Sequence, residues 1–149
     1  MKVSRSSPKG GRYDVCEIFS PPRTTRRATH RGARGGWSLD IATTCTTTGR
    51  KWNLLEDRDQ RKARSMLRRD KPQLLIASPP CTKFSNLQKM NKNKESKTED
   101  MEKAIEMIDF AVDMCTIQLK AGRKFVFEHP STSAAWNLPS VRRLAELEQ

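Results

Sequence analysis

The chain has 149 residues, of which 35% are hydrophobic and 31% charged, and its formal net charge is +12. This length suits one domain with a small core, because single domains commonly span about 100 to 200 residues. No segment reaches the roughly 18 apolar residues of a membrane span, and the basic start lacks the apolar run of a signal peptide. We therefore expect neither membrane insertion nor secretion, and the compartment inside the cell stays open, with the nucleus as one option.

In the first half of the chain, short strands alternate with polar and basic segments. Residues 1–12 have almost nothing to bury, which indicates a disordered basic lead-in before a domain over residues 13–149. The β-branched and aromatic residues from Tyr13 to Phe19 predict a strand. The segment from Arg23 to Ala33 is compatible with a helix or with a basic loop, and Trp37 to Ile41 is a second candidate strand.

The second half alternates more clearly between helices and buried strands. Residues 56–70 have an apolar side and acidic residues in the first turn, which predicts an amphipathic helix. The apolar runs Leu74–Ala77 and Phe125–Phe127 are typical of strands buried on both faces of a parallel sheet. Between them, the polar residues 86–100 predict a loop, and apolar spacings of three and four predict a helix over Met101–Leu119.

The positive charge is concentrated in the first half of the chain. Residues 1–72 hold 18 Lys and Arg against 7 Asp and Glu, whereas residues 73–149 hold 11 against 10. A one-sided basic surface attracts polyanions through counterion release, which makes nucleic acid the expected partner. A solvated basic tail would have the same composition, so charge alone does not decide between the two.

The four cysteines give little support to a metal site or a disulfide framework. They lie about 30 residues apart without a Cys-x-x-Cys pair, and the chain has two histidines. In the absence of a secretory signal, we expect reduced thiols and no bound metal. Cys16, Cys45 and Cys115 are expected to be inert.

The order of elements, closed by a last helix over Val141–Glu148, predicts an α/β fold with a doubly wound, mostly parallel sheet. Such folds bind ligands outside the carboxyl ends of their strands. A Ser-Pro-Pro-Cys motif follows one apolar strand directly, and a Glu-His-Pro motif follows the next. We therefore expect Cys81 and Glu128 to lie at one edge of the sheet, close enough to share one substrate.

Cys81 and Glu128 suggest nucleophilic chemistry. The two prolines before Cys81 form a rigid turn that would display the thiol, as a cysteine nucleophile requires. Glu128 would act on the same substrate as a proton donor or hydrogen-bond partner, and Trp136 would pack behind its loop. The alternative is that the prolines merely end a strand and that Cys81 is a small buried residue.

The motifs resemble those of the cytosine-5 DNA methyltransferases. LLIASPPCTKFS is similar to the catalytic loop of that family, and FVFEHP is similar to the strand that carries its catalytic glutamate. YDVCEIFS and WSLDI resemble the strands that open the S-adenosylmethionine site and bind its ribose. Together the motifs cover residues 13–139 in the family's order, and they are most similar to a divergent group that is often embedded in polyproteins.

The resemblance implies a Rossmann-like methyltransferase fold and methyl transfer from S-adenosylmethionine to carbon 5 of cytosine in DNA. Cys81 would add to carbon 6 of the base, and Glu128 would contact a ring nitrogen of the same base. Because these atoms lie inside the helical stack, the target base must be flipped out. Phe84 and Ser85 would help to shape the catalytic loop.

The resemblance also implies a site for the cofactor S-adenosylmethionine at the strand ends. Glu17 and Phe19 would line the cofactor pocket, and Pro80 would shape the loop beside it. Asp40 would accept the ribose hydroxyls, as acids do in other dinucleotide-type sites. Asn53 falls near the position where the family often has an acid for the adenine amine.

Three features depart from the family's pattern. The loop after Phe19, with the sequence SPPR, replaces a glycine-rich loop and offers fewer backbone donors to a cofactor. His129 stands where the family usually has Asn after the catalytic glutamate. The chain also stops at Gln149, before the family's later strands and target-recognition region, so the resemblance implies a partial catalytic domain truncated at its C-terminus.

Two other functions fit part of the pattern. Methyltransferases that act on exocyclic amines also use Ser-Pro-Pro, but they have an aromatic residue where this chain has Cys81, which favours the covalent route. A catalytically inactive, basic nucleic-acid-binding remnant of a mobile-element polyprotein would keep the motifs without turnover. Cofactor binding distinguishes this remnant from a working methyltransferase.

Overall fold

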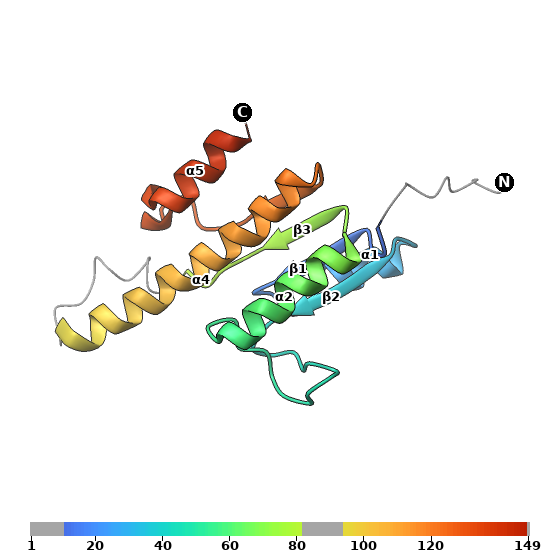
Figure 1. Cartoon of the computed structure of the whole chain (residues 1–149), viewed down its shortest axis with the longest axis horizontal. Coiled ribbons are helices and arrows are strands. Elements are labelled where there is room, and N and C mark those ends of the chain that lie inside the picture. Colours follow the sequence, from blue (N-terminus) through green and yellow to red (C-terminus); the bar gives the residue numbers. More distant parts are fainter. Residues whose placement is uncertain (1–10, 82–93, 149) are drawn as a thin grey trace.

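The computed structural model describes residues 11–81 and 94–148, which form a four-stranded parallel sheet with helices on both faces (Figure 1). The strands are β1 (Val15–Ile18), β2 (Gly35–Leu39), β3 (Leu74–Ala77) and β4 (Lys124–Phe127). Their order across the sheet is β2-β1-β3-β4. Among the described residues, β1 and β3 are therefore the inner strands.

Four α-helices and one short 3-10 helix lie in the described part of the chain. They are α1 (Thr24–His30), α2 (Asp57–Asp70), α4 (Lys94–Lys120), the 3-10 helix η1 (Ala134–Asn137) and α5 (Pro139–Leu147). Figure 1 shows α4 between α2 and α5, and α4 packs against both. None of these described helices combines the length and apolar character needed to cross a membrane.

The alternation of side chains along the strands separates two faces of the sheet. Cys16 of β1 and Leu75 of β3 are register partners, and both are fully buried in the core that includes Ile108 of α4. Glu17 points to the opposite face, where its carboxylate accepts hydrogen bonds from Thr25 of α1. Helices thus lie on both faces, with α1 beside β1 and β2 on the Glu17 face, and the predicted α/β class with a parallel sheet is confirmed. The prediction that Phe125–Phe127 is buried on both faces is wrong, because Val126 of β4 is 46% exposed.

Most of the predicted elements occupy the expected parts of the chain. β1, β3 and β4 form within the predicted apolar runs or extend them by one residue, and they pair in parallel. α2 covers nearly all of the predicted helix over residues 56–70. The segment from Arg23 to Ala33, which the sequence left open, forms α1 over most of its length.

β2 begins and ends two residues earlier than predicted, and its first two residues are Gly35 and Gly36. A Cβ atom on Gly35 would collide with the carbonyl oxygen of Thr25, and one on Gly36 would collide with the ring of Tyr13. Glycine disfavours a strand by propensity, but here it lets α1 and a neighbouring side chain approach the backbone closely.

The polar stretch 94–100 was predicted as part of a loop, and this prediction is wrong. It is helical and forms the start of α4, which begins at Lys94. An ion pair within the helix supports this polar start, with Lys103 Nζ donating to Glu99 Oε1 at 2.7 Å. The rest of the predicted loop, residues 86–93, lies outside the described residues, as do Phe84 and Ser85.

The predicted disordered lead-in is corrected at its last residues. The backbone N–H of Arg12 donates to the carbonyl of Asp70 at 2.7 Å, and the Arg12 guanidinium lies 3.8 Å from the Asp70 carboxylate. Residues 1–10 lie outside the described residues. The end of α2 thus provides partners for Arg12, which belongs to the fold.

Candidate active site

A cleft of about 330 Å³ opens at the carboxyl edge of the sheet, where β1, β3 and β4 end. Its walls come from the segments that follow these three strands. The lining residues are Phe19, Ser20, Pro21, Arg23, Ser78, Pro79, Pro80, Cys81, Glu128 and Pro130. The cleft therefore lies where open α/β sheets bind ligands.

Backbone hydrogen bonds of the sheet bring Cys81 and Glu128 to this cleft. The N–H of Ser78 donates to the carbonyl of Ile18 at 3.1 Å, and the N–H of Glu128 donates to the carbonyl of Ala77 at 2.8 Å. These bonds continue the pairing one residue beyond β3 and β4 and fix how both segments leave the sheet. Cys81 is half-buried and Glu128 is exposed, so a ligand in the cleft has access to both side chains.

His129 connects the two motifs of the cleft. Its ring is buried, lies close to the backbone carbonyl of Pro80 and stacks on Phe127 with the centroids 6.3 Å apart. Burial lowers the pKa of His129, and the Pro80 carbonyl and the charge of Glu128 oppose this effect only in part. A neutral imidazole at pH 7 therefore ties the Glu128 segment to the Cys81 segment.

Trp136 packs behind the glutamate loop, as predicted. Its ring meets Phe127 edge-on at 5.8 Å and His129 edge-on at 6.4 Å between centroids. The indole Nε1 donates to the carbonyl of Pro130 at 2.7 Å. These contacts support the segment that carries Glu128 from the side away from the cleft, where Trp136 is not among the lining residues.

Phe19 has a left-handed backbone with φ of 57°, which is a costly conformation for a residue with a large side chain. Its N–H donates to the carbonyl of Leu39 at 2.8 Å, and its ring meets Phe110 of α4 edge-on at 6.1 Å. Pairing and packing thus hold a strained residue at the wall of the cleft. Strain of this kind is concentrated at functional sites.

Glu17 lies beneath the start of α1, where it is 1% exposed, and it does not line the cleft. The N–H and the hydroxyl of Thr25 both donate to its Oε2 at 2.8 Å, and the N–H of Thr24 donates to its Oε1 at 3.2 Å. Burial raises the pKa of Glu17, but these hydrogen bonds outweigh the burial, and the pKa lies below its ordinary value. Both carboxylate oxygens are thus engaged in holding α1 on the sheet.

Asp40 and Asn53 lie in the loop between β2 and α2, outside the lining of the cleft. Asp40 follows β2 directly, and its Oδ1 accepts a hydrogen bond from the N–H of Ala42 at 2.9 Å. Asn53 bonds within its own turn, with Oδ1 accepting from the N–H of Leu55 at 3.1 Å. Asp40 therefore stands at the same sheet edge as the cleft, whereas Asn53 belongs to the local turn before α2.

The cleft brings together four residues predicted for the site, and they come from the segments after three strands: Phe19, Pro80, Cys81 and Glu128. Three predicted cofactor residues lie elsewhere: Glu17, Asp40 and Asn53. The sequence interpretation missed Arg23, although its place in the loop after β1 was a usable signal. Its exposed guanidinium adds a positive charge to the cleft wall, which favours a phosphate group.

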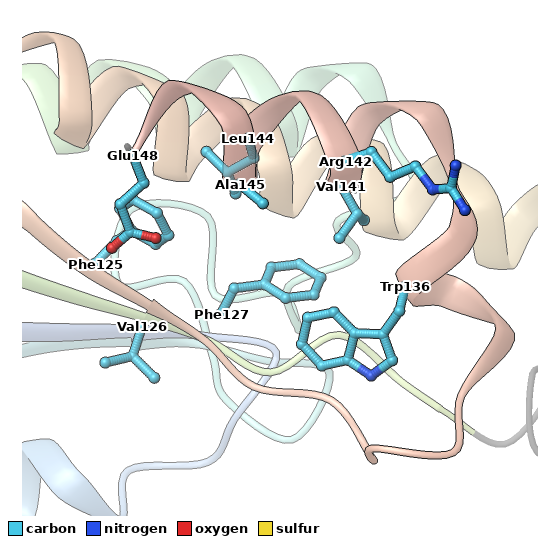
Figure 2. Close-up of a pocket in the computed structure, with 9 residues that line it drawn as sticks. All are labelled: Phe125, Val126, Phe127, Trp136, Val141, Arg142, Leu144, Ala145 and Glu148. Carbon is cyan, nitrogen blue, oxygen red and sulfur yellow. The ribbon is translucent and has the colours of Figure 1, made fainter.

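A second cavity of about 380 Å³ lies between β4 and α5 and has a mainly apolar wall (Figure 2). Figure 2 shows Phe125 and Phe127 pointing toward α5 and Val126 pointing away from it. Arg142 and Glu148 are its charged lining residues. This cavity offers packing surface but no nucleophile, so the cleft at the strand ends is the better candidate for catalysis.

Comparisons of the chain with protein-family profiles, with curated proteins and with solved structures gave no match. Within residues 11–81 and 94–148, no group of three or more His, Cys, Asp or Glu side chains is arranged to hold a metal ion. The features that bear on function are therefore the geometry of the cleft and the resemblance of its motifs.

Proposed function

We propose that the chain is a Rossmann-like methyltransferase domain that transfers a methyl group from S-adenosylmethionine to carbon 5 of cytosine in DNA. The observation that carries this proposal is that Cys81 and Glu128 line the same cleft of about 330 Å³. They belong to motifs that are far apart in the sequence, and the family resemblance assigns both motifs to one base.

In the proposed mechanism, the thiolate of Cys81 attacks carbon 6 of a flipped-out cytosine. A bond forms between sulfur and carbon 6, and the electrons of the double bond between carbons 5 and 6 make carbon 5 nucleophilic. The half-buried position of Cys81 supports this role, because Pro79 and Pro80 restrict the turn that presents the thiol to the cleft. Once carbon 5 is methylated, loss of its proton lets the sulfur leave and restores the ring.

Glu128 would assist this addition at nitrogen 3 of the cytosine ring. A carboxyl group there shares a proton with the ring as negative charge develops during the attack. The exposed position of Glu128 in the cleft supports this role, and the buried ring of His129 fixes the segment by packing against Phe127 and Trp136. Removing the carboxyl should therefore slow the addition without removing the nucleophile.

The described residues fit a cofactor site in part. When bound, S-adenosylmethionine would supply the electrophilic methyl group. Phe19 and Pro80 line the cleft, and Asp40 ends the neighbouring strand, so these three residues fit a cofactor at this edge. Glu17 and Asn53 bond to protein groups instead, so cofactor affinity is the first quantity to measure.

The basic surface beside the cleft supports DNA as the substrate. Arg23 lines the cleft, and Arg26 and Arg27 on α1 are exposed. The sequence contains no acidic residue between Glu17 and Asp40, so the segment that includes α1 carries only positive side-chain charges. Arginines in this position would hold the phosphates that flank a flipped base.

The proposal is tested by incubating the chain with S-adenosylmethionine and DNA that contains 5-fluorocytosine. Because fluorine at carbon 5 cannot leave as a proton does, the bond between sulfur and carbon 6 should persist as a covalent adduct, seen on denaturing gels and by intact mass. Cys81→Ser should abolish the adduct, and the matched control Cys45→Ser should retain it. Glu128→Gln should slow its formation by about 10² to 10⁴. An adduct that survives in Cys81→Ser would show that Cys81 is not the nucleophile.

A second candidate function is a catalytically inactive nucleic-acid-binding domain. It is favoured by the loop after Phe19, where Pro21 and Pro22 have no N–H to offer a cofactor, and by the internal bonding of Glu17. This function predicts salt-dependent DNA binding without S-adenosylmethionine binding and without an adduct. Calorimetric titration with the cofactor separates the two functions.

A further inference from the structure

The loop between β2 and α2 folds into a short hairpin around Cys45. Thr44 and Lys51 form an antiparallel bridge, and the N–H of Cys45 donates to the carbonyl of Arg50 at 2.8 Å. Gly49, at φ of 69°, makes the turn and donates its N–H to the carbonyl of Cys45 at 2.8 Å. Cys45 is 6% exposed, but residues 46–50, which follow it in the hairpin, are themselves exposed. Cys45 therefore lies one loop below the surface.

Lys62 of α2 is the direct partner of this thiol. Its Nζ donates to Cys45 Sγ at 3.0 Å and lies 5.8 Å from the ring centroid of Trp52. Trp52 is buried, and Lys62 is half-buried between the ring and the sulfur. The ring face and the sulfur both attract the ammonium group, which fixes a positive charge at the sulfur atom.

The other charged groups near the hairpin leave this pair intact. Arg50 forms an ion pair with the carboxylate of Asp59 at 3.6 Å. Lys51 Nζ donates to the carbonyl of Ala42 at 2.9 Å. Among the ion pairs of the described residues, none joins a carboxylate to Lys62, so its charge acts on the sulfur.

Hydrogen bonds to the sulfur favour its ionised form. Burial raises the pKa of Cys45, but bonds from the Thr48 hydroxyl, from Lys62 and from the N–H groups of Thr48 and Thr47 outweigh it and lower the pKa to about 6. The sequence interpretation expected an inert residue here, and the structure corrects that expectation. Cys16 and Cys115 behave as expected, because burial in the core raises the pKa of each to about 12.

We propose that Cys45 and Lys62 form a reactive thiolate site that hydrogen peroxide oxidises. The sulfur attacks one peroxide oxygen, the oxygen–oxygen bond breaks, and the departing hydroxide takes a proton from the Lys62 ammonium and leaves as water. Sulfur is oxidised to a sulfenic acid, and the peroxide is reduced. Peroxide is small enough to pass a loop whose residues are exposed, and a thiolate beside a cation is the form that reacts.

The first test is the pH dependence of alkylation in the folded chain. Short pulses of iodoacetamide over a series from about pH 5 to 9 are followed by mass spectrometry of the tryptic peptide Gly35–Arg50, which holds Cys45 as its single cysteine. The rate should reach half its plateau near pH 6. Lys62→Met should lower the rate at about pH 6 by roughly 10- to 100-fold as the midpoint moves toward about 8.5, whereas Lys62→Arg should retain most of it.

The second test is peroxide treatment followed by dimedone, which labels sulfenic acids. The Cys45 peptide should carry the label, the peptides of the core thiols Cys16 and Cys115 should not, and Lys62→Met should lose it. Thr48→Val removes one hydroxyl donor and should give a smaller upward shift of the alkylation midpoint. This variant tests the proposal even if Lys62→Met does not fold. A wild-type midpoint near 8.5, or peroxide treatment that leaves Cys45 unlabelled, overturns the proposal.

Discussion

Glu17 shows how one side chain can be placed by the fold rather than by a ligand. Glu17 belongs to the strand motif that resembles a cofactor site. Its carboxylate, however, accepts hydrogen bonds from the N–H groups of Thr24 and Thr25 at the start of α1. No acidic residue lies in the first turn of α1, so Glu17 supplies from the sheet the negative charge that a helix start favours. The short helix depends on this contact from a neighbouring strand.

We predict that Glu17→Gln destabilises the fold at pH 7 by about 1 to 3 kcal/mol, because an amide NH₂ would face backbone donors in place of an acceptor. Urea unfolding of both proteins measures the difference. Its pH dependence follows from the lowered pKa of Glu17. The unfolded chain takes up a proton near the ordinary value of 4.5, and the folded chain takes it up at lower pH.

The stability that Glu17 contributes should therefore be complete above the ordinary pKa and should be lost as the pH falls through the folded one. The gap between wild type and Glu17→Gln should narrow in acid. A gap that stays constant from neutral pH down to about pH 3 would contradict the assigned role of the carboxylate. Glu106→Gln, on the exposed side of α4, is the matched control and should change stability little at any pH.

At the residue scale, the sequence predicts which residues reach the sheet edge but not what each side chain bonds to. Cys81 and Glu128 could be placed because each follows an apolar run within a few residues, and parallel strands share one carboxyl edge. The Cys45 and Lys62 contact could not, because it joins a loop to a helix 17 residues further along the chain. Partner choice of this kind is decided by tertiary packing.

At the element scale, the sequence predicts elements where a hydrophobic pattern decides and fails where close packing decides. Leu74–Ala77 forms β3 with the predicted bounds, since a short apolar run is buried most readily as an inner strand of a parallel sheet. β2 starts at Gly35 because α1 approaches the backbone there, a contact that strand propensity does not register. α4 begins before its first apolar residue, Met101, because polar residues continue a helix once a packed segment anchors it.

The length of α4 makes it the main support of the sheet, so a cavity in it should be costly. Ile108 is fully buried in the core that α4 shares with β1 and β3. We predict that Ile108→Ala lowers the free energy of unfolding by about 2 to 5 kcal/mol, the range for large-to-small changes at packed sites. Glu106→Ala, exposed on the same helix, should change it by less than about 0.5 kcal/mol. Equal losses in the two variants would mean that α4 does not pack as described.

At the scale of the whole molecule, charge and cleft coincide. The net charge of +12 comes almost entirely from the first half of the chain, and that half supplies α1, which begins directly after the cleft residue Arg23. Charge of one sign around a binding cleft raises the local concentration of an oppositely charged ligand and speeds its encounter. The arrangement thus suits a polyanion whose reacting group enters the cleft while its backbone lies along α1.

This arrangement predicts where salt dependence of DNA binding should originate. Each phosphate contact that is removed should reduce the slope of log K against log salt by about 0.9, since fewer counterions are released on binding. Arg26→Ala with Arg27→Ala on α1 should therefore weaken DNA binding and flatten the slope, measured by fluorescence anisotropy over a salt series. Arg142→Ala with Arg143→Ala on α5 removes the same charge from exposed positions that do not line the cleft, and it should leave the slope nearly unchanged. If both double variants lose the same slope, binding follows net charge alone, and α1 has no special place beside the cleft.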